Sequence, residues 1–149
     1  VTGSDGNLQM AVGFQSSIYE GDLDDYRLNW YSEIYIVKYT SDNSKRFFPK
    51  VPIIRLSEMY LIAAEASGDK GYLQTLRDHR GYVNYPLEEN CDLAAEIEAE
   101  YRKEFIAEGQ LFYYYKRLDY VTLPEMGVVM TGNYVFPMPD DEIEFGDIK

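Results

Sequence analysis

The sequence predicts a mainly α-helical fold, with a tetratricopeptide-like helical hairpin at its core and irregular or extended segments at both ends. Three observations predict it. Apolar residues recur at helical spacing between residues 53 and 107, aspartates stand where two helices should start, and glycines follow the expected helix ends. An aromatic share of 15% also argues against disorder, because disordered chains contain few aromatic residues.

Residues 1–50 are predicted to form an extended, loop-rich segment, and residues 51–149 a helical region of the same domain. The first segment is rich in Gly, Ser and Asp. Within it, Glu33–Tyr39 is rich in β-branched and aromatic residues and predicts a short strand. We expect Phe47 and Phe48 to lie in the core.

The first predicted helix spans Ile53 to Ala66, and Ser67-Gly68 ends it, because glycine accepts the left-handed conformation that follows many helices. Leu61 and Ile62 widen its apolar stripe, which indicates burial on more than one side. The stripe itself is formed by Leu56, Met59, Tyr60, Ala63 and Ala64.

The second predicted helix starts after Asp69, whose carboxylate can accept a backbone N–H, and ends at Gly81. Two helices joined by so short a turn form an αα-hairpin. The residues expected on its inner stripe are Tyr72, Leu73, Leu76 and Arg80.

A third helix is predicted from Asp92 to Ala107, with Leu93, Ile97, Tyr101 and Phe105 four residues apart. Gly109 breaks it, and Gln110–Tyr120 predicts a fourth, aromatic-rich helix that must bury some of its rings. The tail contains Pro124, Pro137 and Pro139, and a short extended piece is expected at Tyr134–Phe136.

The charge and the chain ends narrow the classes of partner. The net charge is −12 and the pI is near 4.4, whereas binding to nucleic acid or anionic lipid needs Lys and Arg. We therefore expect no nucleic-acid partner, while a neutral ligand such as a sugar meets no electrostatic penalty. No stretch approaches the about 18 consecutive apolar residues of a membrane span. The start at Val1, without a signal peptide, is typical of a mature or trimmed piece.

Few residues offer catalytic or cofactor chemistry. A nucleophile usually needs a histidine as its base, and His79 is the only histidine, so most nucleophile–base pairs are excluded. We interpret His79 itself as a polar residue at a helix end, where it interacts favourably with the helix dipole. Cys91 is the only cysteine, so the sequence contains no zinc cluster and no intrachain disulfide. The acidic register Asp22–Glu33 fails as a calcium loop, because Arg27 replaces the required glycine. We expect no metal and no cofactor.

The 26 acidic residues supply many pairs of carboxylates. A glycosidase needs two at a defined separation across a cleft, which the sequence does not give. Glu100, Glu104 and Glu108 are interpreted as one helix face, paired with Arg102 and Lys103.

Tyr26, Arg27, Trp30 and Tyr31 are the candidate ligand-binding residues. They lie in the loop-rich segment, and loops carry function more often than packed helices do. Aromatic faces can hold the apolar side of a sugar ring, while polar groups bind its hydroxyls. The alternative is that the three aromatic residues anchor this segment onto the helices.

Three segments resemble motifs of the SusD/RagB family. Pro52–Ala66 resembles its P-I-I-R-L-x-E-x-Y-L-x-x-A-E-A helix, and Glu100–Gly109 is similar to its E-R-x-x-E-F-x-x-E-G motif. Phe136–Pro139, followed by Glu142-Ile143, is similar to its closing L-P-I-P-x-x-E-I. The order and spacing agree as well, over residues 50–146.

The chain also departs from this family at three places. Leu76–Gly81 stands where the family has V-R-x-R-A-G, and Gln110–Arg117 lacks the Arg and Asp of H-R-W-x-D-L-x-R. Gly146 stands where an Asn is common. These departures indicate a divergent subgroup and leave its helix-to-helix polar contacts open.

The resemblance implies a surface-exposed lipoprotein of the outer membrane that binds a glycan, or in some relatives a peptide, without catalysis. Its implied partner is a TonB-dependent, SusC-like transporter, and its only membrane attachment is a lipid anchor outside this chain. Ligand contacts in such proteins come from variable loops, so no motif residue is given a binding role. Two other functions stay open: a helical scaffold for protein partners without sugar affinity, and a glycosidase that uses two carboxylates.

Overall fold

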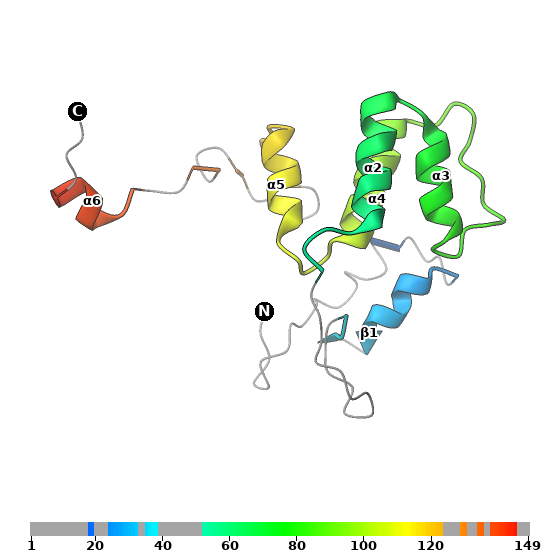
Figure 1. Ribbon diagram of the computed structural model, residues 1–149, viewed down its shortest axis with the longest axis horizontal. Coiled ribbons are helices and arrows are strands. Elements are labelled where there is room, and N and C mark those ends of the chain that lie inside the picture. Colours follow the sequence, from blue (N-terminus) through cyan, green and yellow to red (C-terminus); the bar gives the residue numbers. More distant parts are fainter. Residues whose placement is uncertain are drawn as a thin grey trace. The chain divides into compact units, whose positions relative to one another are not determined.

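A computed structural model describes residues 18–19, 24–32, 35–38, 52–123, 129–130, 134–135 and 138–145. The described elements are mainly helical, as predicted (Figure 1). They belong to two compact units, Val1–Glu108 and Gly109–Lys149, which are described in turn. The expected core residues Phe47 and Phe48 lie outside the described residues, as do Asp22 and Glu33 of the acidic register.

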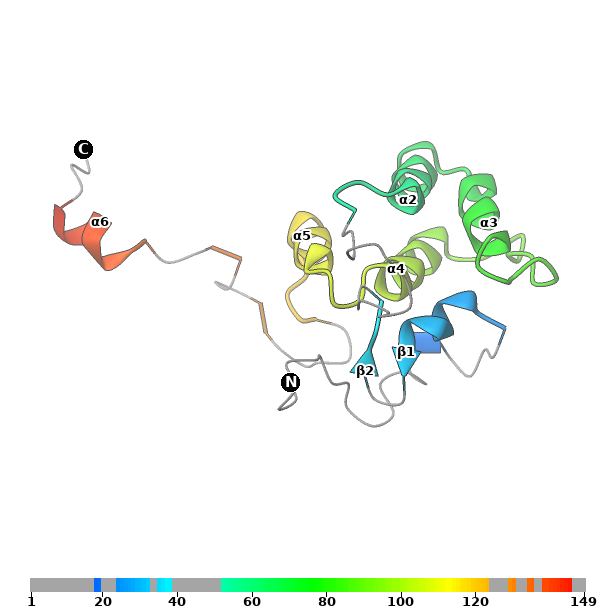
Figure 2. The same ribbon diagram turned by 60° about the horizontal axis from the view of Figure 1, so that its bottom comes forward.

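Three helices form the main body of the first unit: α2 (Leu56–Ser67), α3 (Lys70–Asp78) and α4 (Leu93–Glu104). Helix α2 packs against both α3 and α4, as Figures 1 and 2 show. The predicted hairpin and the predicted packing of the first helix on the third are therefore confirmed. The closer likeness to a tetratricopeptide pair stays a prediction. The buried apolar residues of the three helices are Leu61, Ala64, Leu73, Leu76, Ile97 and Tyr101.

The helix start and stop signals act as predicted. The carboxylate of Asp69 accepts the backbone N–H of Gly71 (2.8 Å), and that of Asp92 accepts the N–H groups at the start of α4. These bonds satisfy donors that have no partner within the helix. Gly68 adopts a left-handed conformation (φ 69°), and its N–H donates to the carbonyl of Ala64 (3.0 Å).

Helix α4 ends at Glu104, before the predicted end at Ala107. The carbonyl oxygen of Glu104 accepts hydrogen bonds from Nη2 of Arg55 (2.6 Å) and from the ammonium group of Lys38. The backbone N–H of Glu108, which would donate to this carbonyl in a continuing helix, donates instead to the carbonyl of Phe105 (3.2 Å). Two cationic side chains from distant segments thus replace the backbone N–H as donors to the last carbonyl of α4.

The other two helix ends shift for related reasons. Helix α2 starts at Leu56 because Arg55 is extended (φ −121°), which lets its side chain reach α4. Helix α3 ends at Asp78, and the carbonyl of Arg80 instead accepts the backbone N–H of Tyr26 (2.8 Å).

The apolar stripe of α2 is only partly buried. The residues that α2 buries are Ser57, Leu61 and Ala64, a narrow face toward α3 and α4. The prediction that its wider stripe is buried was therefore wrong for the first unit as the structure describes it. The exposed apolar residues at and before α2 are Ile53, Ile54, Leu56, Met59 and Ile62.

A short 3-10 helix, η1 (Tyr26–Trp30), lies in the part of the N-terminal segment that packs on the helices. Asp25 caps it, because its carboxylate accepts the backbone N–H of Arg27 (2.8 Å). Figure 2 shows η1 beside α4 and below the end of α3.

Strands β1 (Tyr31–Ser32) and β2 (Tyr35–Ile36) follow η1 and pair antiparallel. Of the predicted strand Glu33–Tyr39, the described residues contain strand at Tyr35–Ile36 alone. Tyr31 packs against a small buried cluster formed by Ile18, Tyr19 and Ile106. This cluster fixes the hairpin to the residues that follow α4.

The second unit contains α5 (Gln110–Arg117) and α6 (Asp140–Phe145). The aromatic helix buries Tyr114 and Tyr115 and leaves Tyr113 exposed, so the prediction that it buries some of its rings is confirmed. Tyr134 and Val135 form a turn rather than the predicted extended piece. The sequence did not predict α6, which starts directly after Pro139 and uses its carbonyl as first acceptor (3.1 Å).

None of the helices in the described ranges is long and apolar enough to cross a membrane.

Candidate functional site

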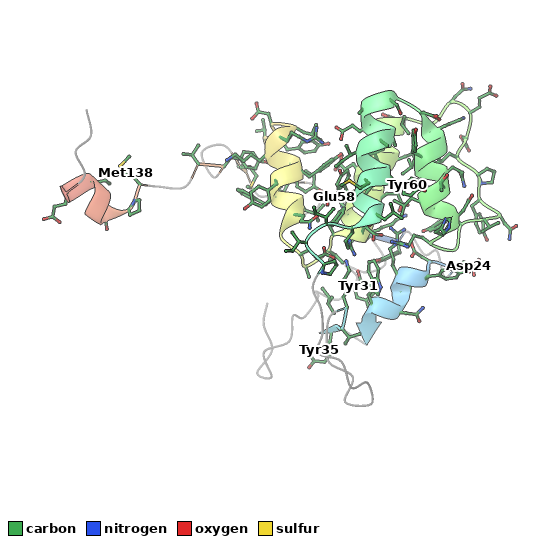
Figure 3. All side chains as sticks on the ribbon, in the orientation of Figure 1. Asp24, Tyr31, Tyr35, Glu58, Tyr60 and Met138 are labelled. Atoms are coloured by element: carbon green, nitrogen blue, oxygen red, sulfur yellow. The ribbon has the colours of Figure 1, made fainter. Side chains whose placement is uncertain are left out.

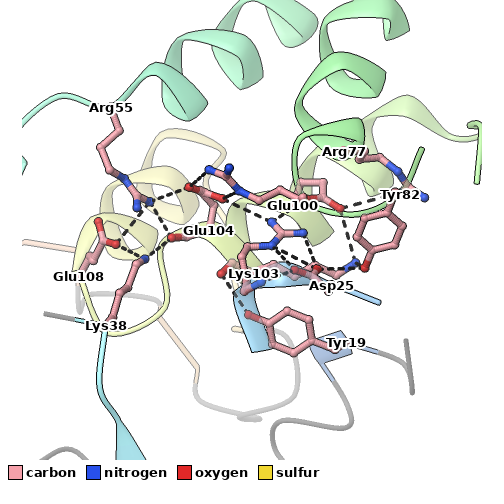
Figure 4. A network of polar contacts seen from close by, with 12 residues as sticks. Tyr19, Asp25, Lys38, Arg55, Arg77, Tyr82, Glu100, Lys103, Glu104 and Glu108 are labelled. Carbon is pink, nitrogen blue, oxygen red and sulfur yellow. Dashed lines mark hydrogen bonds and ion pairs between the residues drawn. The ribbon is translucent and has the colours of Figure 1, made fainter. Parts of the chain in front are cut away.

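A buried network of ion pairs joins η1 to α4 (Figure 4). Nη1 of Arg27 lies 2.7 Å from Glu100 and 3.5 Å from Glu104, which are one turn apart on α4. Nη2 of Arg27 lies 2.7 Å from the carboxylate of Asp25. All four of these side chains are fully buried. A buried charge is tolerated only when it is paired, and here each charge has an opposite partner.

Glu104 is the centre of this network. Arg80 donates two hydrogen bonds to its carboxylate, from Nε (2.9 Å) and from Nη2 (2.8 Å). This bidentate geometry is the strong form of an arginine–carboxylate pair. Arg55 adds a third cation at 3.2 Å. Glu104 therefore connects α4 to the segments before α2 and after α3, as well as to η1.

One end of the network lies at Glu108. Its carboxylate pairs with Lys38 and lies 3.3 Å from Arg55. The ammonium group of Lys38 also sits 4.0 Å from the ring centre of Trp30. A cation over an aromatic face is attracted to it, so Trp30 helps to hold Lys38 in place at this end of the network.

The other end of the network lies at Tyr82, which is buried. The hydroxyl of Tyr82 donates to Asp25 (3.0 Å) and accepts from Lys103 (3.3 Å). Arg77 lies over the Tyr82 ring at 4.8 Å and pairs with Glu96 (2.8 Å). The segment between α3 and α4 is in this way tied to the cap of η1.

The acidic face of α4 therefore has partners that we did not predict. Of the two expected local partners, Lys103 does lie 3.5 Å from Glu100, but the shorter contacts come from arginines in other segments. The acidic face points into the first unit because η1 and the ends of α2 and α3 supply these arginines. In the segment that departs from the family's V-R-x-R-A-G motif, Arg77 matches the first Arg of the motif and Arg80 replaces its Ala, and both make polar contacts to α4.

The arginines around Glu104 hold it ionised. Burial by itself would raise the pKa of Glu104, but the hydrogen bonds and charge of Arg80, with the charges of Arg27 and Arg55, outweigh burial and lower the pKa from 4.5 to about 2. A group whose pKa is lowered by folding stabilises the fold above its unfolded pKa and loses that contribution as the pH falls through the folded pKa.

We predict that Glu104→Gln is less stable than wild type at neutral pH and that this difference in stability disappears in acid. The lowered pKa corresponds to about 3 kcal/mol of stabilisation at neutral pH. The difference in free energy of unfolding between wild type and variant should be fully present above pH 4.5 and should shrink toward pH 2. Urea unfolding at a series of pH values measures it. A difference that stays constant from pH 7 to pH 2.5 would contradict the assigned charge state.

The structure separates the four predicted ligand-binding residues. Tyr26 has 62% of its surface exposed, whereas Arg27 has none and is fully engaged by carboxylates. Trp30 is half-buried under Lys38, and Tyr31 is half-buried with its ring edge on Tyr19 (5.8 Å). The prediction of Arg27 as a ligand contact does not fit this burial, because a side chain without accessible surface cannot touch a ligand. The surroundings of Trp30 and Tyr31 fit the anchoring alternative.

The remaining candidates for chemistry are placed as follows. His79 is exposed at the end of α3, and its Nδ1 lies 2.8 Å from the carbonyl of Thr75. Cys91 is half-buried before α4. In the part of the chain that the structure describes, no group of three or more His, Cys, Asp or Glu side chains is arranged to hold a metal ion.

The described residues form a mainly helical fold in which charged residues of the motifs lie in a buried ion-pair network. A family model described as the SusD family matches residues 9–128, which is most of the chain. The chain therefore belongs to the SusD family, as its motifs indicated. The two longer motifs lie within the matched residues and the closing motif lies after them. Comparisons with curated proteins and with solved structures gave no significant match.

Residues from two of the family motifs contact one another in the buried network. Arg55 comes from the first motif and Glu104 and Glu108 from the second, and the three side chains meet in the network. The two motifs, which are far apart in the sequence, thus supply the partners of one set of ion pairs.

Proposed function

We propose that this chain is part of a non-catalytic, glycan-binding protein at the outer-membrane surface, which delivers its ligand to a TonB-dependent, SusC-like transporter. The proposal rests on membership of the SusD family. Attachment to the membrane would come from a lipid anchor outside these residues.

The observation that supports a ligand-binding surface is the exposure of Tyr26 on a fixed base. Its helix η1 is held by the ion pair between Asp25 and Arg27 and by the hydrogen bond from the backbone N–H of Tyr26 to the carbonyl of Arg80. A rigid, exposed aromatic ring can take the apolar face of a sugar without first losing conformational freedom. An overall charge of −12 places no penalty on a neutral ligand.

We predict that Tyr26→Ala weakens glycan binding about fivefold or more, because stacking on the exposed ring is lost. Affinity gels containing neutral polysaccharides measure the change in migration. Trp30→Ala tests the neighbouring candidate in the same gels. Unchanged migration of both variants, with wild type retarded, would remove this segment from the site and leave glycan binding to other residues.

A second function, a scaffold for protein partners, is favoured by the exposed apolar residues along α2. Contiguous exposed apolar surface usually marks an interface. A pure scaffold would bind the transporter and would show no retardation by any polysaccharide. Within the glycosidase alternative, Glu104 does not suit the role of general acid, since its lowered pKa holds it ionised and a general acid must be protonated at working pH.

A further inference from the structure

The start of η1 and the segment after α3 meet at Gly81. The backbone N–H of Tyr26 donates to the carbonyl of Arg80 (2.8 Å). A side chain on Gly81 would meet the backbone of Asp24 and the ring edge of Tyr26, so the absence of a side chain is what allows this approach. Figure 3 shows Asp24 beside the end of α3. Two segments far apart in sequence thereby share one piece of surface.

This shared surface carries two exposed tyrosines. Tyr85 has 50% of its surface exposed and Val83, in the turn before it, 67%. The hydroxyl of Tyr85 donates to the carboxylate of Asp24 (3.3 Å), which itself is exposed. We call Asp24, Tyr26, Val83 and Tyr85 the tyrosine rim.

The tyrosine rim stands on the buried network. The ring of Tyr85 packs edge-on against Tyr82 (6.3 Å), and the hydroxyl of Tyr82 donates to Asp25. Asp25 in turn holds Arg27 within η1. Both tyrosines of the rim are thus fixed to one base, and no large rearrangement is needed to present them together.

We propose that the tyrosine rim is a binding site for a neutral, pyranose-containing glycan. Two exposed aromatic rings suit the apolar C–H faces of sugar rings, while the Asp24 carboxylate and the tyrosine hydroxyls can accept and donate hydrogen bonds to sugar hydroxyls. The rim includes the exposed carboxylate of Asp24, and the whole chain has a net charge of −12, so a uronate or a sulfated sugar would be repelled where a neutral sugar is not. This inference rests on the proposed function and adds Asp24, Val83 and Tyr85 to it, residues that no sequence motif marks.

The test compares Tyr85→Ala and Tyr85→Leu with Tyr72→Ala in the purified protein. Tyr72 is a partly exposed tyrosine at the far end of α3 and serves as the matched control. The leucine variant keeps an apolar contact to Tyr82, so it remains informative if the alanine variant does not fold. Isothermal titration and affinity gels use a panel of neutral polysaccharides. For each one that binds, its carboxymethylated derivative is tested in parallel.

We expect at least a fivefold loss of affinity in the Tyr85 variants, less than a twofold change in Tyr72→Ala, and weaker binding of the carboxymethylated glycan. If wild type binds a neutral glycan and the Tyr85 variants bind it equally well, the rim is not the site and the proposed function stands. Equal or tighter binding of the charged derivative overturns the preference for neutral sugars. If wild type binds no polysaccharide, the proposed function and the rim both fail. Loss of transporter binding with unchanged glycan affinity would assign the rim to a protein partner instead.

Discussion

Replacing Glu104 by alanine is expected to lower the free energy of unfolding by about 3–5 kcal/mol, because removing one partner of a buried ion pair leaves uncompensated charge in the interior. Here the carboxylate is shared by Arg27, Arg55 and Arg80, so one substitution leaves three guanidinium groups short of a partner. Chemical denaturation at neutral pH measures the loss.

The matched control is Glu96→Ala on the same helix. Glu96 also pairs with an arginine, Arg77 (2.8 Å), but 35% of its side chain is exposed. Water screens this pair, and a loss of no more than about 1 kcal/mol is expected. Similar losses in the two variants would mean that the burial of Glu104 contributes nothing beyond an ordinary surface ion pair.

The same substitution bears on ligand binding through η1. Arg27 is held by Asp25, Glu100 and Glu104 together, and it fixes the helix that carries Tyr26. A weaker network would let η1 move, and the aromatic surface would lose its rigid base. The motif residues of the family therefore support the proposed binding surface, to which they do not themselves belong.

The helices could be predicted from the sequence because their signals are local. Asp69, Asp92 and Gly68 act within one turn of their own positions, and the apolar spacing from Leu93 to Tyr101 reports one helix face. Interactions between residues three or four positions apart are set by helix geometry alone. The four helices α2 to α5 were therefore predicted, their ends less well, and η1 and α6 were not predicted.

The network and the rim could not be predicted, because their partners are far apart in the chain. Glu104 is 24 residues from Arg80 and 77 from Arg27. A carboxylate followed by lysine and arginine on one helix reads locally as a solvated face, and only the packing of η1 and α3 reverses this. The same holds for Tyr85. Its hydroxyl bonds to Asp24, and both Asp24 and Tyr26 lie against Gly81.

Substituting alanine for Gly81 is expected to lower the free energy of unfolding by about 2–4 kcal/mol, for two reasons that add. Gly81 has φ +110°, a conformation that residues with a side chain rarely adopt. A methyl group there would also overlap the carbonyl oxygen of Asp24 and press on the ring of Tyr26. Because both neighbours belong to the rim, glycan affinity should fall in the same variant. Thermal or urea unfolding and the affinity gels measure the two effects.

Gly68→Ala separates the two reasons. Gly68 also has a positive φ, +69°, but a methyl group there would have no neighbour within 4 Å. This control should lose only the conformational contribution, about 1 kcal/mol, and should keep its glycan affinity. The difference between the two variants then measures the close approach of η1 to the end of α3. If both variants lost the same stability, that approach would contribute nothing to the fold, and the rim would lack the fixed geometry on which its proposed sugar binding depends.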